Sequence, residues 1–100
     1  MSILSEILKE EYERLNNTLS SFEALAASLP KGSIREKLIN GKKYQYLQWR
    51  DGNKVLSRYI KPDEIQALSE QVKKRKQYEK EIKLLRETKK EFDLVIKKEL

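Results

Sequence analysis

Two tight-turn signals in the middle of the chain constrain its fold most strongly. Residues 33–60 read SIREKLI-NG-KKYQYLQWR-DG-NKVLSRYI, three strand-like runs separated by Asn40-Gly41 and Asp51-Gly52. Both dipeptides are preferred in type I′ hairpin turns, because both central residues of that turn need φ > 0. The segment therefore predicts a three-stranded antiparallel sheet with short connections.

The first turn also sets which side chains share a face of the sheet. If Asn40-Gly41 is a two-residue loop, Ile39 pairs with Lys42 and the pairs proceed outward from there. One face is then apolar and suited to packing on helices, with Ile34, Leu38, Leu47 and Trp49. The other face is basic and aromatic, with Arg35, Lys37, Tyr44, Tyr46 and Gln48. On the apolar face, Trp49 is expected to anchor the core.

The second turn leaves two registers open. As a two-residue loop, Asp51-Gly52 places Leu56 opposite Leu47 on the apolar face, and Tyr59 opposite Tyr44 on the basic face. A longer loop that includes Asn53 and a bulge would turn the third strand over. We predict the two-residue loop.

Long helical segments flank the predicted sheet. Over residues 2–29 a heptad stripe is held for three heptads by Leu8, Tyr12, Leu15, Leu19, Phe22, Ala26 and Leu29. Pro30 and Gly32 end this helix. A second helix is predicted over residues 62–99, with Pro62 as its first residue and with Asp63 and Glu64 in its first turn. Its apolar positions are Ile65, Leu68, Val72, Tyr78, Ile82, Leu85, Phe92, Val95 and Ile96.

These elements together predict an α+β protein, a single domain over residues 1–100. Two long antiparallel, coiled-coil-like helices are connected by a three-stranded antiparallel β-meander. Two helices alone would leave much of Phe22, Phe92, Ile96 and Leu100 exposed. We therefore expect a homodimer formed through the helices.

The middle segment carries most of the excess positive charge. Residues 31–61 hold nine basic and two acidic residues, a net charge of +7, whereas residues 1–30 hold two basic and five acidic ones, a net charge of −3. This asymmetry indicates an anionic partner, and nucleic acid fits best because Lys and Arg neutralise phosphates while Tyr stacks on bases. The candidate nucleic-acid-binding residues are Arg35, Lys37, Lys42, Lys43, Tyr44, Tyr46, Arg50, Lys54, Arg58 and Tyr59.

Two other interpretations of this segment stay open. The same residues are compatible with an ordinary solvated strand face in which cross-strand aromatic pairs support the sheet. They are also compatible with a protein-interaction module, either an antitoxin-like partner or a coiled-coil scaffold.

The composition narrows the chemistry. The chain has no Cys and no His, which excludes thiolate nucleophiles, histidine acid–base catalysis and zinc sites of the Cys/His type. Its carboxylate pairs sit in charged helices without a pocket to separate their pKa values. We therefore expect a protein that is not an enzyme and binds no cofactor or metal. Without a signal peptide or a long apolar run, a cytoplasmic protein that does not enter the membrane is expected.

Several short stretches form a recognisable pattern: Leu29-Pro30-Lys31-Gly32-Ser33, Tyr44-Gln45-Tyr46-Leu47-Gln48-Trp49-Arg50, Asp51-Gly52 and Ser57-Arg58-Tyr59-Ile60. From Leu29 to about Leu85 the chain resembles a family of small uncharacterised prokaryotic proteins, a domain of unknown function. The resemblance implies no established activity. Its likeness to neighbours of mobile elements and of nucleotidyltransferase-type toxin genes implies a DNA-binding or antitoxin-like accessory role. The hairpin also resembles the arm-type DNA-binding sheets of phage integrases.

Overall fold

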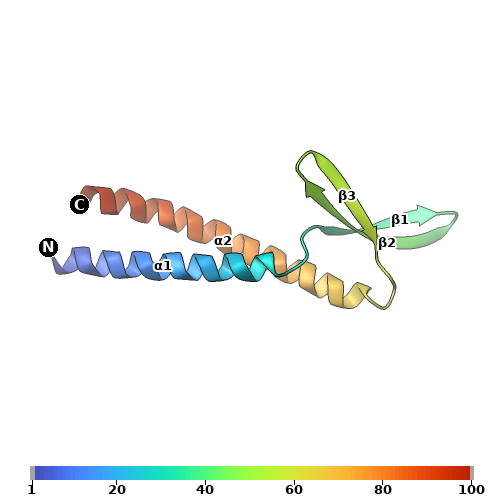
Figure 1. The fold of residues 1–100 in the computed structure, drawn as a ribbon, viewed down its shortest axis with the longest axis horizontal. Helices are drawn as coiled ribbons and strands as arrows, with labels where there is room; N and C mark the ends of the chain where they lie inside the picture. The colour runs from blue at the N-terminus through green and yellow to red at the C-terminus, as the bar shows by residue number, and fades with distance from the viewer. Residues whose placement is uncertain (1, 100) are drawn as a thin grey trace. The chain divides into compact units, whose positions relative to one another are not determined.

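The computed structural model describes residues 2–99 and contains two helices and three strands. Along the chain they are α1 (Ile3–Ala27), β1 (Ser33–Ile39), β2 (Lys42–Asp51), β3 (Lys54–Tyr59) and α2 (Ile65–Glu99). Figure 1 shows the two helices with the three-stranded sheet between them in the sequence. The predicted α+β arrangement is confirmed.

The chain divides into two compact units. The helical unit contains α1 and the part of α2 from Gln77 onward, and the sheet unit contains Leu29–Lys76. The sheet unit thus includes the three strands and the first part of α2. The boundaries of a single domain over residues 1–100 stay a prediction.

In the helical unit, the heptad stripe of α1 packs on α2. Every stripe position on α1 is buried or half-buried, and Leu19, Ala26 and Ile82 form the centre of the core. The helices run antiparallel: Tyr12 near the start of α1 donates a hydrogen bond of 2.7 Å to Asp93 near the end of α2, while Phe22, later in α1, contacts Tyr78, earlier in α2. Phe22 and Tyr78 pack their rings at 5.6 Å between centroids.

The expected exposure of the aromatic and terminal side chains is wrong. Phe22, Phe92 and Ile96 are half-buried, because the two stripes cover each other along their length, and Leu100 lies outside the described residues. Val95 departs from the predicted stripe and is 45% exposed. The apolar side chains that do face solvent at this end of the pair are different ones: Ile3, Leu4, Ile7, Leu94 and Val95.

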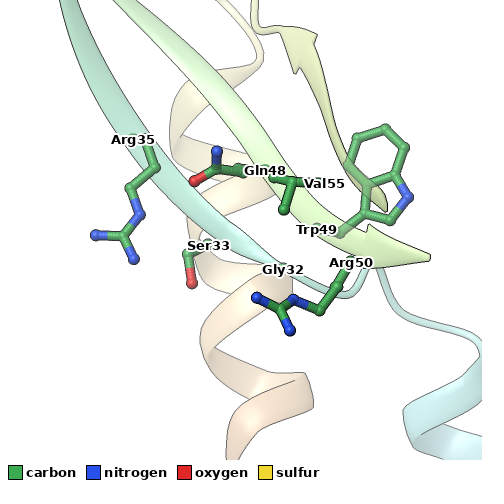
Figure 2. A pocket seen from close by; sticks show the side chains of 7 residues that line it. All are labelled: Gly32, Ser33, Arg35, Gln48, Trp49, Arg50 and Val55. Atoms are coloured by element: carbon green, nitrogen blue, oxygen red, sulfur yellow. The ribbon is translucent and has the colours of Figure 1, made fainter. Parts of the chain in front are cut away.

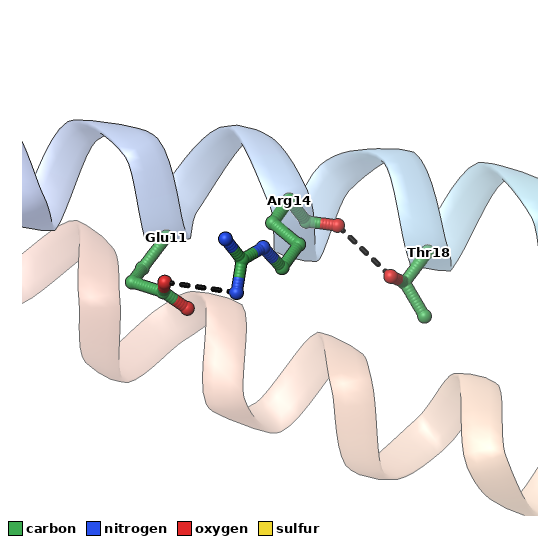
Figure 3. Close-up of polar contacts among 3 residues, drawn as sticks. All are labelled: Glu11, Arg14 and Thr18. Carbon is green, nitrogen blue, oxygen red and sulfur yellow. Dashed lines mark hydrogen bonds and ion pairs between the residues drawn. The ribbon is translucent and has the colours of Figure 1, made fainter.

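The outer surface of α1 is stabilised by local polar contacts. Ser2 caps the helix by accepting a hydrogen bond from the Ser5 N–H at 3.2 Å. Farther along, Arg14 forms an ion pair of 3.2 Å with Glu11, and its carbonyl accepts a hydrogen bond from the Thr18 hydroxyl (Figure 3). Such exposed pairs contribute only about 0.5 kcal/mol each, so the buried stripe dominates the stability of this unit.

The second helix begins three residues later than predicted. Pro62 is not its first residue but lies in a turn in which the Glu64 N–H donates to the Lys61 carbonyl at 2.9 Å. The fixed φ of proline suits the second position of a turn as well as the first position of a helix. The helix itself starts at Ile65, and its first turn holds no acidic residue.

The three strands form one antiparallel sheet in the order β1-β2-β3. The first hairpin has the predicted register, in which Ile39 pairs with Lys42 and Ile34 pairs with Leu47. Asn40 and Gly41 both have positive φ, 51° and 80°, as a type I′ turn requires. One hairpin loop precedes β2 and the other follows it, so the two loops lie at opposite ends of this strand, and β3 pairs with β2 only from Tyr46 onward.

The predicted register of the third strand is wrong by two residues. Asp51 pairs with Lys54, so the two-residue loop is Gly52-Asn53 rather than Asp51-Gly52. Gly52 has a φ of 62° while Asn53 has no positive φ, which fits a turn with glycine at its first central position. A register shift of two residues leaves each side chain of β3 on the same face of the sheet, because side chains alternate between the faces with a period of two residues. Leu56 therefore lies opposite Trp49, still on the apolar face.

One face of the sheet packs on the first part of α2. The core of this unit contains Leu47, Ile60, Leu68 and Val72, with Ile34, Trp49 and Ile65 half-buried against it. The prediction that Trp49 anchors the core is therefore confirmed. Leu38 was expected in this core but is 69% exposed, because it pairs with Lys43 near the loop of the first hairpin, beyond the part of the sheet that the helix covers.

Candidate nucleic-acid interface

The side of the sheet opposite the core, here called the tyrosine face, collects seven of the ten predicted binding residues. Strand alternation together with the observed register places these seven there: Arg35, Lys37, Lys42, Tyr44, Tyr46, Arg50 and Tyr59. The remaining strand residues of this face are Ser33, Ile39, Gln48, Val55 and Ser57. The other three predicted residues, Lys43, Lys54 and Arg58, lie on the opposite face, here called the helix face.

The two faces differ in charge. The strand residues of the tyrosine face include four cationic side chains and no Asp or Glu. The helix face carries three cationic side chains and two carboxylates, Glu36 and Asp51. Uncompensated positive charge is therefore concentrated on the tyrosine face, which is the property that attracts a polyanion.

Three tyrosine rings meet on this face. Tyr59 makes edge-to-face contacts with Tyr44 and with Tyr46, at 6.1 Å and 5.8 Å between ring centroids. The ammonium group of Lys37 lies over the Tyr46 ring, 4.7 Å from its centre. Tyr44 and Tyr46 are half-buried and Tyr59 is 44% exposed, so part of the aromatic surface is open to a ligand.

Next to the tyrosines, the face has a shallow depression of about 370 Å³. It is lined by Ser33, Arg35, Gln48, Arg50 and Val55 from the tyrosine face, together with Gly32 and Trp49. Figure 2 shows the Arg35 and Gln48 side chains on one side of the strands, while the Trp49 indole points away from them. The depression therefore places two guanidinium groups and an amide around one space.

The lysine at the end of the sheet unit adds a further cation to this region. The Lys76 ammonium donates a hydrogen bond of 3.4 Å to the Ser33 hydroxyl. The sequence gives no signal for this contact, because Lys76 lies more than forty residues from Ser33 and only packing of α2 on the sheet brings them together. Its neighbour Arg75 donates to the Leu29 carbonyl at 2.5 Å and holds the loop before β1 against α2.

On the helix face, Arg58 has a different environment. Its guanidinium group lies 3.8 Å from the Glu64 carboxylate, and both side chains are about half exposed. This contact ties β3 to the turn that precedes α2. The positive charge of Arg58 is thus partly compensated by Glu64, whereas neither Arg35 nor Arg50 has an ion-pair partner among residues 2–99.

The fold and this surface define an α+β protein with a helix–sheet–helix order and a basic, tyrosine-rich sheet face. The chain belongs to the family described as domain of unknown function DUF6788, whose model matches residues 4–74. The match begins in α1, includes the whole sheet and ends within the first part of α2. No curated protein and no solved structure matches the chain significantly.

Two further observations concern the part of the chain that the structure describes. Neither helix there contains an apolar stretch of the length and hydropathy needed to cross a membrane. Within residues 2–99, no cluster of three or more acidic side chains is arranged to hold a metal ion.

Proposed function

We propose that the protein is a small non-enzymatic accessory protein that binds nucleic acid through the tyrosine face. The observation that carries the proposal is the segregation of charge across the sheet, with four cations and no carboxylate on the strands of this face. A protein that needed only a solvated strand face would gain nothing from excluding carboxylates there. Interspersed charges of both signs are the usual pattern of a surface without such a partner.

The chemistry of the face suits a phosphate backbone. Lys and Arg side chains that contact phosphates release condensed counterions, which supplies most of the affinity of nonspecific binding. Tyrosines add stacking surface or donate hydrogen bonds to phosphate oxygens. The DNA-binding, antitoxin-like or mobile-element-associated roles that the family resemblance implies are finer proposals.

Two adjacent lysines provide a matched test. Lys42 and Lys43 are both exposed strand residues, but Lys42 belongs to the tyrosine face and Lys43 to the helix face. Fluorescence anisotropy with labelled short DNA and RNA, measured over a series of salt concentrations, compares Lys42→Glu with Lys43→Glu. We expect Lys42→Glu to weaken binding about tenfold and to lower the salt slope by about one.

The control variant makes the same change of charge at the neighbouring position. We expect Lys43→Glu to retain most of the affinity, since long-range repulsion alone is screened by salt. Equal losses for the two variants would show that the net charge of the protein, and not this face, determines binding. Absence of binding by the unchanged protein at low salt would refute the proposed function.

A second candidate function is protein interaction through the helical unit, with a second copy of the chain as the partner. The hydrogen bond between Tyr12 and Asp93 sets the start of α1 beside the end of α2, where Ile3 and Leu94 are 77% and 64% exposed. The last turn of α2 is basic, whereas α1 carries a net charge of −3. Antiparallel association of two copies would bring these opposite charges together.

Analytical ultracentrifugation tests this candidate. We expect a dimer at micromolar concentration for the unchanged protein and a monomer for a variant that combines Ile3→Glu with Leu94→Glu. A monomer at all concentrations for the unchanged protein would refute the candidate. The sheet is not altered in this variant, so it also separates self-association from nucleic-acid binding.

A further inference from the structure

The depression on the tyrosine face is lined by two arginines that have no ion-pair or hydrogen-bond partner among the described side chains. Among the described residues, no side chain forms an ion pair or hydrogen bond with the guanidinium group of Arg35 or Arg50, or with the side-chain amide of Gln48. Other arginines of the chain do have partners, as Arg58 has Glu64 and Arg86 has Glu23. Two unpartnered guanidinium groups beside one depression leave a concentration of donors that suits an anion.

The backbone at the edge of the depression is shaped by Gly32. Gly32 has a φ of 120°, and a Cβ atom there would collide with the Gln48 carbonyl oxygen. The loop before β1 therefore lies directly against β2 at Gln48. Ser33 follows, and its hydroxyl already accepts a hydrogen bond from Lys76. The space is thus bordered by closely packed backbone and by polar donors.

The depression continues the row of tyrosines along β2. Tyr44, Tyr46, Gln48 and Arg50 are successive residues of the same face, each about 7 Å from the next along the strand. Tyr59 from the neighbouring strand widens the aromatic part of this row through its contacts with both tyrosines. A chain lying along β2 would pass from aromatic rings to the arginines without leaving the face.

We propose that the depression binds a phosphodiester group of a single-stranded nucleic acid whose unpaired bases stack on Tyr44, Tyr46 and Tyr59. This inference rests on the proposed function and narrows it from nucleic acid to a single strand. The bases of a duplex are stacked on one another, so only an unpaired strand offers its base faces to protein rings. Arg35 and Arg50 hold the backbone beside the stacked bases, with hydrogen bonds to the phosphate oxygens.

Binding of a labelled single-stranded oligonucleotide and of the duplex it forms with its complement tests this inference. We expect the unchanged protein to bind the single strand at least about tenfold more tightly than the duplex, because only unpaired bases can stack on the tyrosine rings. Arg35→Gln and Arg50→Gln should each weaken single-strand binding about tenfold and lower the salt slope by about 0.7. Lys43→Gln, which removes one charge from the helix face, should have little effect.

The outcomes separate the inference from the proposed function on which it rests. If the protein binds oligonucleotides but the two arginine variants behave as Lys43→Gln does, the phosphate site is refuted and the proposed function stands. Equal or tighter binding of the duplex refutes the single-strand preference in the same way. If the unchanged protein binds neither the single strand nor the duplex, the phosphate site and the proposed function are both refuted. Circular dichroism of each variant checks folding, which we expect to be intact because both arginines are exposed and make no ion pair with the described residues.

Discussion

Replacement of Gly32 by alanine should destabilise the sheet unit strongly. Gly32 precedes β1 with a φ of 120°, a value that side-chain-bearing residues rarely adopt. Its missing Cβ leaves room for the carbonyl of Gln48, a residue in the middle strand that pairs with Ser33 on one side and Ser57 on the other. This carbonyl cannot move away without displacing the centre of the sheet.

The expected loss of unfolding free energy follows from the backbone strain at residue 32 and from the displacement of the Gln48 carbonyl. A non-glycine residue in this region of φ carries roughly 2 kcal/mol of strain, and displacement of the packed backbone adds about 1 kcal/mol. Alanine also restricts the unfolded chain, which offsets roughly 0.5–1 kcal/mol of this loss. The free energy of unfolding should therefore fall by about 2–2.5 kcal/mol, a large part of the stability of so small a unit.

Urea denaturation followed by the fluorescence of Trp49, the only tryptophan, measures this change in the sheet unit. Gly41→Ala is the matched control, because Gly41 also has a positive φ, 80°, but has no atom within 4 Å of the position of an added Cβ. We expect the control to lose only about 0.5–1 kcal/mol, the strain of a left-handed conformation less the same entropic offset. A Gly32→Ala protein as stable as Gly41→Ala would refute the argument from close backbone packing.

Two predictions concern contacts elsewhere in the chain. The hydrogen bond that the Tyr12 hydroxyl donates to Asp93 raises the pKa of Tyr12 above its ordinary value of 10.0. Only the protonated phenol donates this hydrogen bond. The unchanged protein should therefore be more stable than Tyr12→Phe below pH 10.0, and this difference in the free energy of unfolding should disappear as pH rises through the raised pKa of Tyr12. Urea denaturation at a series of pH values, followed by circular dichroism, measures the difference. Arg75→Ala removes the hydrogen bond to the Leu29 carbonyl and should lower the free energy of unfolding by about 1–2 kcal/mol. A loss no greater than that of Lys74→Ala, its exposed neighbour, would contradict this role.

Most of the architecture could be predicted because it depends on local chemistry. Asn40-Gly41 favours one turn type, and that turn determines the register of the whole first hairpin. The stripe of α1 follows the helical period, so its buried face could be identified residue by residue. Both signals act over a few residues and need no partner to be recognised.

The errors arose where two local signals compete. Asp51-Gly52 and Gly52-Asn53 are both acceptable hairpin loops, and pairing of Trp49 with Leu56 across the sheet accompanies the second. Pro62 is compatible with the start of a helix and with a turn, and the structure has the turn. In each case two local conformations have similar energies, and contacts with the rest of the chain determine which one forms.

The sequence by itself determined the order of the elements, the antiparallel pairing of β1 with β2, and the alternation that separates tyrosines from the apolar core. These depend on backbone preferences and periodicity, which any isolated segment already has. Only the tertiary structure decided that Asp51 pairs with Lys54, so that the second loop is Gly52-Asn53, and that Lys76 reaches Ser33. Such placements depend on the register of the strands and on packing between distant residues, and neither is encoded in the spacing of charges along the chain.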